Sequence, residues 1–253
     1  MQQGFTELSD SQWQKCSNLL NSPRKRKHSL REIFNAILWI NRSGAQWRLL
    51  DSKYPKWQIV YYYFQKWTRE GFLEQFLDSL IEMQRKAENR SSSPSLLAID
   101  SQSVRIVPFT SAEVGIDGGK KVKGRKRTIL VDNLGYPLSI VVTAANVSDN
   151  EAGILALEQL RGKVPNLKLI AADAGYKNAF VQYAKSTLGV EVEIAQKPES
   201  TKGFIPQKNR WFVERSFSWT TFRRILLRDV EKSTESAVAM IQIAFISLII
   251  NFF

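Results

Sequence analysis

Residues 96–100 read Leu-Leu-Ala-Ile-Asp, and residues 167–173 read Leu-Lys-Leu-Ile-Ala-Ala-Asp. Each stretch is a short apolar run that stops at an acidic residue, a pattern typical of a buried strand. In open α/β sheets, ligands bind at the carboxyl ends of the strands. Asp100 and Asp173 are therefore candidates for one shared site at the edge of a sheet.

The segments around these two runs alternate between strand and helix patterns. Further strands are predicted over residues 120–132, 136–147 and 190–195, and helices over residues 149–162, over 178–188 and from residue 209 onwards. The order β-β-β-α-β-α-β-α predicts an α/β domain, residues 96–253, with a mixed sheet and flanking helices.

The first part of the chain, residues 1–89, has only helical patterns. Two capping boxes, beginning at Ser9 and Ser29, each precede a helical segment, and Gly44 marks the end of the second one. The aromatic segment 57–67 is interpreted as helix core rather than as a base-stacking platform. The polar residues 90–95 predict a linker, so that this part forms a small all-helical domain.

The charge of the chain favours an acidic partner. Its 253 residues include 36 Lys and Arg against 24 Asp and Glu, which gives a net charge of +12. Because basic residues cluster, double-stranded DNA is the leading candidate. The helical domain is interpreted as helix-turn-helix-like, with a basic loop at Arg24, Lys25, Arg26 and Lys27; a helical bundle that binds no DNA is the alternative.

Residues 120–127 are the most basic stretch. We interpret them as a hairpin that contacts DNA phosphates; a solvated edge strand, whose lysines discourage aggregation, is the alternative. The side chains expected to make these contacts are Lys120, Lys121, Lys123, Arg125, Lys126 and Arg127.

Several classes of enzyme are excluded by the residue counts. One Cys and one His rule out an intramolecular disulfide and a His/Cys zinc site. The one His, His28, adjoins the basic run 24–27, which argues against a Ser-His-Asp hydrolase. Any catalysis must then rest on carboxylates, Lys or Tyr, with a hard metal ion expected. Glu214, on a predicted helix, is the third candidate acid beside the two aspartates. Three converging carboxylates repel one another unless a cation is bound, and oxygen ligands suit Mg²⁺ or Mn²⁺. Taken singly, each aspartate could instead cap a turn, and Glu214 could pair with Arg210 or Arg215.

The two ends of the chain bear on its location. The N-terminus has no apolar segment typical of a signal peptide, and the lone Cys16 suits a reducing compartment. Residues 236–253 carry no charge. We interpret them as a buried core helix, with a membrane anchor as the alternative.

Three segments, residues 98–104, 172–176 and 210–215, resemble the acid motifs of the DDE transposases of bacterial insertion sequences, in the insertion-sequence-five family. Residues 43–48, 118–127 and 145–149 agree with that family as well. The resemblance covers about residues 5–250 and implies a ribonuclease-H-like fold. It also implies a metal-binding catalytic triad of Asp100, Asp173 and Glu214, holding two Mg²⁺ or Mn²⁺ ions.

The resemblance further implies what such a protein does. A transposase binds the terminal inverted repeats of its element, cleaves the ends and transfers the 3′-OH to target DNA. The implied partners are double-stranded DNA, contacted also by Arg210 and Arg215, and further copies in a homodimer or larger synaptic complex. The implied location is the bacterial cytoplasm, at the nucleoid and away from membranes. A metal-dependent nuclease that joins no strands and a non-catalytic, domesticated DNA-binding regulator are the alternatives.

Overall fold

The computed structural model describes residues 7–20, 27–108, 112–195 and 210–251. Its first part is helical, as predicted, and both capping boxes are confirmed: the Ser9 and Ser29 side chains each accept a backbone N–H from three residues ahead. The second helix ends at Gly44, whose φ of 69° is the left-handed conformation that glycine tolerates. The helices of this part are α1 Asp10–Leu19, α2 Leu30–Ser43, α3 Trp57–Arg69 and α4 Phe72–Ala87, with a 3-10 turn at Trp47–Leu49.

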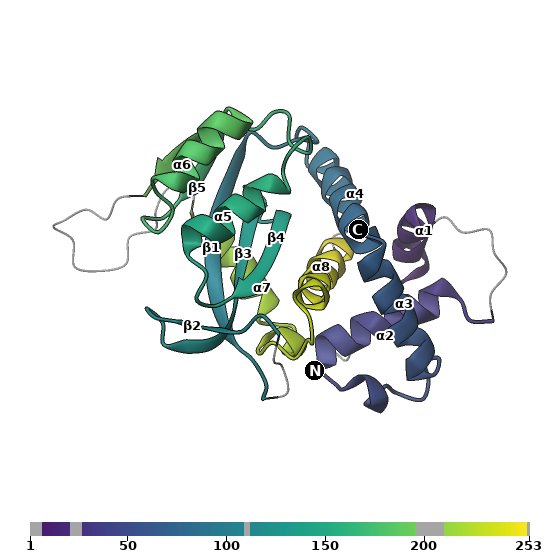
Figure 1. Ribbon diagram of the computed structural model, residues 1–253. Coiled ribbons are helices and arrows are strands. Elements are labelled where there is room, and N and C mark those ends of the chain that lie inside the picture. The colour runs from purple at the N-terminus through teal and green to yellow at the C-terminus, as the bar shows by residue number, and fades with distance from the viewer. Residues whose placement is uncertain (1–6, 21–26, 109–111, 196–209, 252–253) are drawn as a thin grey trace.

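The second part contains a mixed sheet, as predicted (Figure 1). β1 lies inside it, antiparallel to β3 on one side and parallel to β5 on the other, and β5 in turn pairs with β6 in parallel. Both β4 and the short β2 pair with β3. The sequence did not predict β2, because three residues are too few to show a strand period. The strands are β1 Leu96–Arg105, β2 Gly115–Asp117, β3 Val122–Asp132, β4 Pro137–Ala144, β5 Leu169–Ala172 and β6 Glu191–Ile194.

Helices cover both faces of the sheet (Figure 1). Alternate residues of β1 belong to different cores: Leu97 and Ile99 pack in the cluster under α5 and α6, whereas Ala98 packs in the cluster that contains α7 and α8. Asp100 shares the strand face of Ala98, so it points toward α7. The helices of this part are α5 Asp149–Glu158, α6 Ala179–Tyr183 with a π-helical extension Ala184–Leu188, α7 Trp211–Thr220, a 3-10 turn Arg224–Leu226, and α8 Thr234–Ile250.

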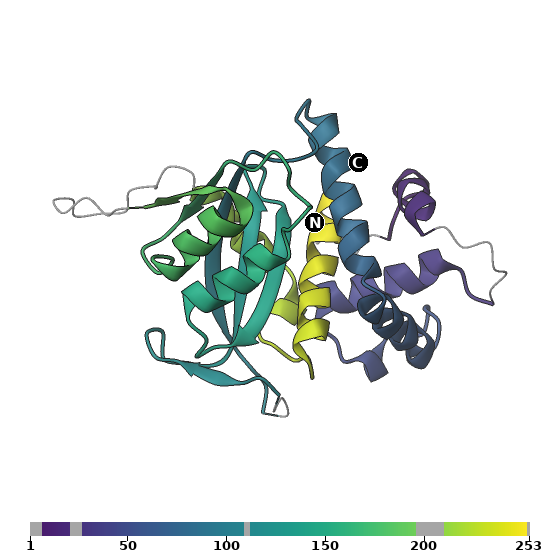
Figure 2. The same ribbon diagram turned by 45° about the horizontal axis from the view of Figure 1, so that its top comes forward.

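The uncharged C-terminal segment forms the helix α8, which packs against α4, α2, α3 and β4 (Figure 2). Most of its side chains are buried, and one apolar core extends from Leu8 to Ile250 across the predicted linker. The prediction of a core helix is thus confirmed. Within the described residues, no helix has both the length and the apolar character that crossing a membrane requires.

A buried ion pair also joins the helical part to the sheet. The Arg85 guanidinium of α4 contacts the Asp132 carboxylate at the end of β3, and both side chains are almost fully buried. The other oxygen of Asp132 accepts the backbone N–H groups of Leu134 and Tyr136, at 3.0 and 2.9 Å. α4 is therefore attached to the β3–β4 turn by a fully hydrogen-bonded charge pair.

Candidate active site

The structure brings two of the three predicted acids together. Ala98 of β1 pairs with Ala171 of the parallel strand β5, and Asp100 and Asp173 each follow two residues later. Since side chains alternate along a strand, the two carboxylates lie on the same face of the sheet at the same level. This face is the one that α7 covers.

Arg210, the residue that caps the start of α7, lies against both carboxylates. Its Nη2 is 3.3 Å from Oδ2 of Asp100 and 3.9 Å from Oδ2 of Asp173. The Arg210 side chain is 14% exposed, and those of Asp100 and Asp173 are 23% and 37% exposed. A largely buried guanidinium therefore neutralises two carboxylates that would otherwise repel each other.

Burial raises the pKa of the Asp100 carboxyl above its usual value. The N–H of Ser101, which Oδ1 of Asp100 accepts at 2.7 Å, opposes this rise, as does the charge of Arg210. The nearby Asp173 carboxylate adds to it. Burial therefore disfavours the ionised form of Asp100 more than the neighbouring groups favour it. An additional cation close to the carboxylate would stabilise that form.

Glu214 is the third predicted acid, and it lies one helical turn after Arg210 in the first turn of α7. Its side chain is exposed. No group of three or more His, Cys, Asp or Glu residues, among those that the structure describes, is close enough to hold a metal ion. The structure therefore joins Asp100 and Asp173 in one cluster and leaves Glu214 at its margin.

The donor set nevertheless suits a hard divalent cation. Asp100 and Asp173 offer only oxygen atoms, which Mg²⁺ and Mn²⁺ prefer. The guanidinium of Arg210 occupies the position of positive charge between them.

A buried hydroxyl network supports Asp100 from the other face of β1. The Ser101 hydroxyl is 2.8 Å from that of Thr128 and 2.5 Å from the Tyr176 phenol. Burial raises the pKa of Tyr176 well above its ordinary value, and the surrounding carboxylates of Asp100, Asp149 and Asp173 raise it further. The phenol therefore stays protonated. Tyr176 ends the motif 172–176, but the sequence does not indicate its place in this network.

The basic stretch divides into exposed and buried residues. Lys120, Lys121 and Lys123 are exposed. The Lys120 ammonium donates to the Ser101 carbonyl at 3.0 Å, which places it beside Asp100. The other two lysines line a groove with Arg105, Ile106, Val107, Pro108 and Val114.

The other three basic residues of the stretch are buried, which contradicts their prediction as phosphate contacts. Arg125 is 0% exposed and donates to Asp229 at 3.2 Å and to four backbone carbonyls. Arg127 donates to the Leu226 carbonyl at 2.7 Å, and Lys126 to the Asp149 carboxylate at 2.8 Å. A phosphate cannot reach these groups, because the strand lies between helices and its side chains are used by the fold.

Arg215 stacks between two indoles of α7, with its guanidinium carbon 4.5 Å from the ring centre of Trp211 and 4.8 Å from that of Trp219. Sequence reasoning missed this arrangement, although the spacing of four residues along a helix could have indicated it. Of the predicted basic loop, Lys27 is exposed, whereas Arg24, Lys25 and Arg26 lie outside the described residues.

Comparison with known proteins agrees with this architecture. Residues 91–250 match the family described as "Transposase DDE domain", and residues 8–77 match the "Putative transposase of IS4/5 family". Over 113 residues, 42% of the chain, it is 33% identical to the "Putative transposase for insertion sequence element IS402" of Burkholderia cepacia, and the match spans 53% of that protein. Over 117 residues, 45% of the chain, it is 27% identical to "Uncharacterized protein y4sN" of Sinorhizobium fredii, 87% of which is covered.

The first family match spans most of the α/β part, and it identifies the mixed sheet with its flanking helices as the ribonuclease-H-like fold of DDE enzymes. The second match covers most of the helical part. The chain belongs to the DDE transposases of the IS4/5 type.

Proposed function

We propose that this chain is an active transposase, which binds the terminal inverted repeats of an insertion sequence, cleaves the element ends and transfers each 3′-OH to target DNA. The observation that carries the proposal is the pair of carboxylates, Asp100 and Asp173, on neighbouring strands with Arg210 against both. Such a pair requires positive charge, and it lies where the parallel pairing of β1 with β5 ends.

Asp100, Asp173 and Glu214 are the residues that would hold Mg²⁺ or Mn²⁺, as two ions in the manner of the family. When bound, such ions polarise a phosphodiester and activate water or a 3′-OH as the nucleophile. The exposed Glu214 can approach the aspartates only if α7 or its side chain shifts. Arg210 neutralises the aspartates in the absence of metal, and its forked guanidinium suits a DNA phosphate once it leaves them.

Exposed basic side chains would hold the DNA backbone. Lys120 lies beside Asp100, and Lys121 and Lys123 line the neighbouring groove. Lys27 and the adjacent basic residues would contribute from the helical part, and Arg215 from α7. We further propose that two or more copies hold the two element ends together, at the nucleoid of a bacterial cytoplasm.

The test is strand cleavage on a plasmid that carries the inverted repeats flanking the gene, in Mg²⁺ and in EDTA. The expected result is nicks at the repeat ends with Mg²⁺ only, lost in Asp100→Ala and kept in Glu191→Gln, an exposed acid on β6 that serves as the matched control. Binding to the same DNA, measured by gel shift, should survive in Asp100→Ala.

Two other outcomes of this test would favour a different function. Nicks without joined products would favour a nuclease that transfers no strand. Binding of the repeats without any nick, in Mg²⁺ and in Mn²⁺, would favour a non-catalytic regulator, in which Arg210 holds the two aspartates permanently.

A further inference from the structure

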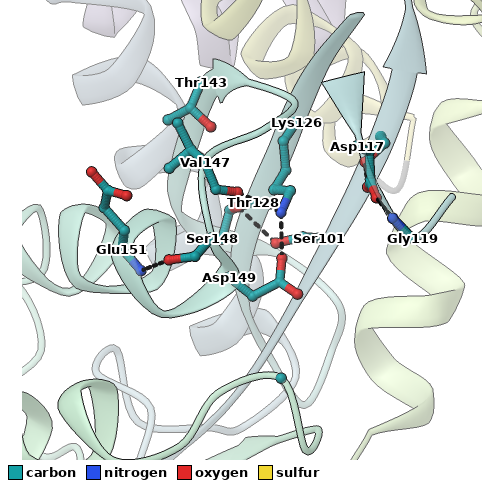
Figure 3. A network of polar contacts seen from close by, with 12 residues as sticks. Ser101, Asp117, Gly119, Lys126, Thr128, Thr143, Val147, Ser148, Asp149 and Glu151 are labelled. Carbon is teal, nitrogen blue, oxygen red and sulfur yellow. Dashed lines mark hydrogen bonds and ion pairs between the residues drawn. The ribbon is translucent and has the colours of Figure 1, made fainter. Parts of the chain in front are cut away.

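A second polar cluster begins at Lys126 of β3 and includes Val147 and Asp149 (Figure 3). Lys126 stands opposite Ser103 of β1, so it lies on the other face of the sheet from Asp100 and Arg210. The Lys126 side chain is only 8% exposed. Its ammonium donates to the Val147 carbonyl at 2.6 Å and to Oδ1 of Asp149 at 2.8 Å. A buried lysine thus attaches the first turn of α5 to the sheet.

The other carboxylate oxygen of Asp149 faces the turn that follows β5. A methyl group built on Gly175 would lie 3.0 Å from Oδ2 of Asp149 and 2.9 Å from Oδ1 of Asp173. The next residue of α5 touches the same turn, because Oδ1 of Asn150 accepts the Lys177 backbone N–H at 2.9 Å. The start of α5 therefore contacts the turn at two points.

This turn carries Asp173. Its Oδ1 accepts the Gly175 N–H at 2.8 Å, and its carbonyl accepts the Tyr176 N–H at 3.1 Å. The backbone from Gly175 to Lys177 thus holds the aspartate on one side and α5 on the other. α5 and the Asp173 carboxylate are therefore bonded to the same short stretch of backbone.

We propose that Lys126, Asp149 and Asn150 form a clamp that positions Asp173 to bind a divalent cation with Asp100. The inference rests on the proposed function, because it assigns the clamp to the metal site of that function. The three are positioning residues: Asn150 is hydrogen-bonded to the turn, Asp149 lies against it, and Lys126 holds Asp149.

The Lys126–Asp149 ion pair explains how the clamp is held, with the lysine buried and the carboxylate 37% exposed. Replacing Lys126 by Met leaves the Val147 carbonyl without this donor and the Asp149 carboxylate without its counter-charge, so the first turn of α5 loses its polar attachment to β3. Groups that orient a metal ligand from behind typically change metal affinity about 10- to 100-fold when they are removed.

The experiment compares Lys126→Met, Asp149→Ala, Asp149→Asn and Asn150→Ala with wild type, in the full chain. The matched control is Lys168→Met, an exposed lysine just before β5. Two quantities are measured: the Mn²⁺ dissociation constant by electron paramagnetic resonance, and the exchange of the Gly175 and Lys177 amide protons in metal-free protein. Near-UV circular dichroism checks folding.

The clamp predicts at least about 10-fold weaker Mn²⁺ binding and faster exchange of both amides in Lys126→Met and Asp149→Ala. Asp149→Asn keeps an acceptor for the lysine and should lose less Mn²⁺ affinity than Asp149→Ala. Lys168→Met should match wild type in Mn²⁺ affinity and in amide exchange. Folded variants with Mn²⁺ affinity and exchange within twofold of wild type would overturn the proposal. If Lys126→Met does not fold, Asn150→Ala decides by the same criteria.

If the proposed function is wrong, the same measurements give a different result. In that case wild type itself binds no Mn²⁺, and Asp100→Ala changes nothing. The exchange of Gly175 and Lys177 in metal-free protein still tests the clamp, and unchanged exchange in Asp149→Ala would reject it.

Discussion

Glu231 should make the stability of this protein fall as the pH rises. It lies between the 3-10 turn and α8, is only 9% exposed, and is close to Asp229. Burial, followed by the charge of Asp229, raises the pKa of its carboxyl from 4.5 to about 8, and Arg125 opposes this rise only in part. At neutral pH the folded protein therefore keeps this carboxyl protonated.

The sign of the effect follows from proton binding. Between the unfolded pKa of 4.5 and the folded pKa of about 8, the folded state holds a proton that the unfolded state has released. The free energy of unfolding therefore falls with rising pH across this window and is constant above it. One pKa unit corresponds to about 1.4 kcal/mol, so the full loss is about 4 to 5 kcal/mol.

The perturbation that isolates this effect is Glu231→Gln, which keeps the shape of the protonated carboxyl and cannot ionise. Urea unfolding of wild type and variant is measured at intervals from pH 5 to pH 9. The variant should gain stability relative to wild type as the pH rises, with a difference of about 4 to 5 kcal/mol reached above pH 8. A difference that stays constant within about 1 kcal/mol over this range would refute the reasoning, because Glu231 would then titrate alike in both states.

Three further predictions concern stability and DNA binding. Arg85→Ala should lower the free energy of unfolding, measured in urea, by about 3 to 5 kcal/mol, because it leaves the fully buried Asp132 carboxylate without its partner. Adding Asp132→Asn to this variant should recover part of the lost stability. Gly124→Ala should cost at least about 3 kcal/mol in the same assay, since the new methyl would lie 1.8 Å from the Val104 carbonyl oxygen; wild-type stability would contradict the strand pairing. Lys123→Gln should weaken DNA binding and make the slope of log K against log salt shallower by about 0.9 in filter binding, and an unchanged slope would remove this lysine from the interface.

Much of the fold follows from local patterns. Capping boxes at Ser9 and Ser29 predicted two helix starts, and apolar runs ending at Asp100 and Asp173 predicted β1 and β5. The expected end of β1 was wrong, because the strand continues past Asp100 to Arg105 through its pairing with β3. These signals are local, because a helix start needs only its own first turn and a buried strand only an apolar run. The pairing of the two aspartates could also be foreseen, once parallel neighbouring strands were assumed.

The basic stretch of β3 shows what local patterns do not decide. Lys123, Arg125 and Lys126 have similar charges in the sequence, yet the first is exposed and the other two are buried. Which of them reaches solvent depends on partners far along the chain, such as Asp229 for Arg125 and Asp149 for Lys126.

The sequence by itself therefore predicted the order of the longer elements and the family, and it named Asp100, Asp173 and Glu214 as the candidate acids. Only the tertiary structure decided that Arg210 lies against Asp100 and Asp173, that Glu214 stays at the margin, and that Lys126 holds α5 instead of DNA. The physical reason is that side chains of a strand alternate between two faces, and long-range packing determines what covers each face.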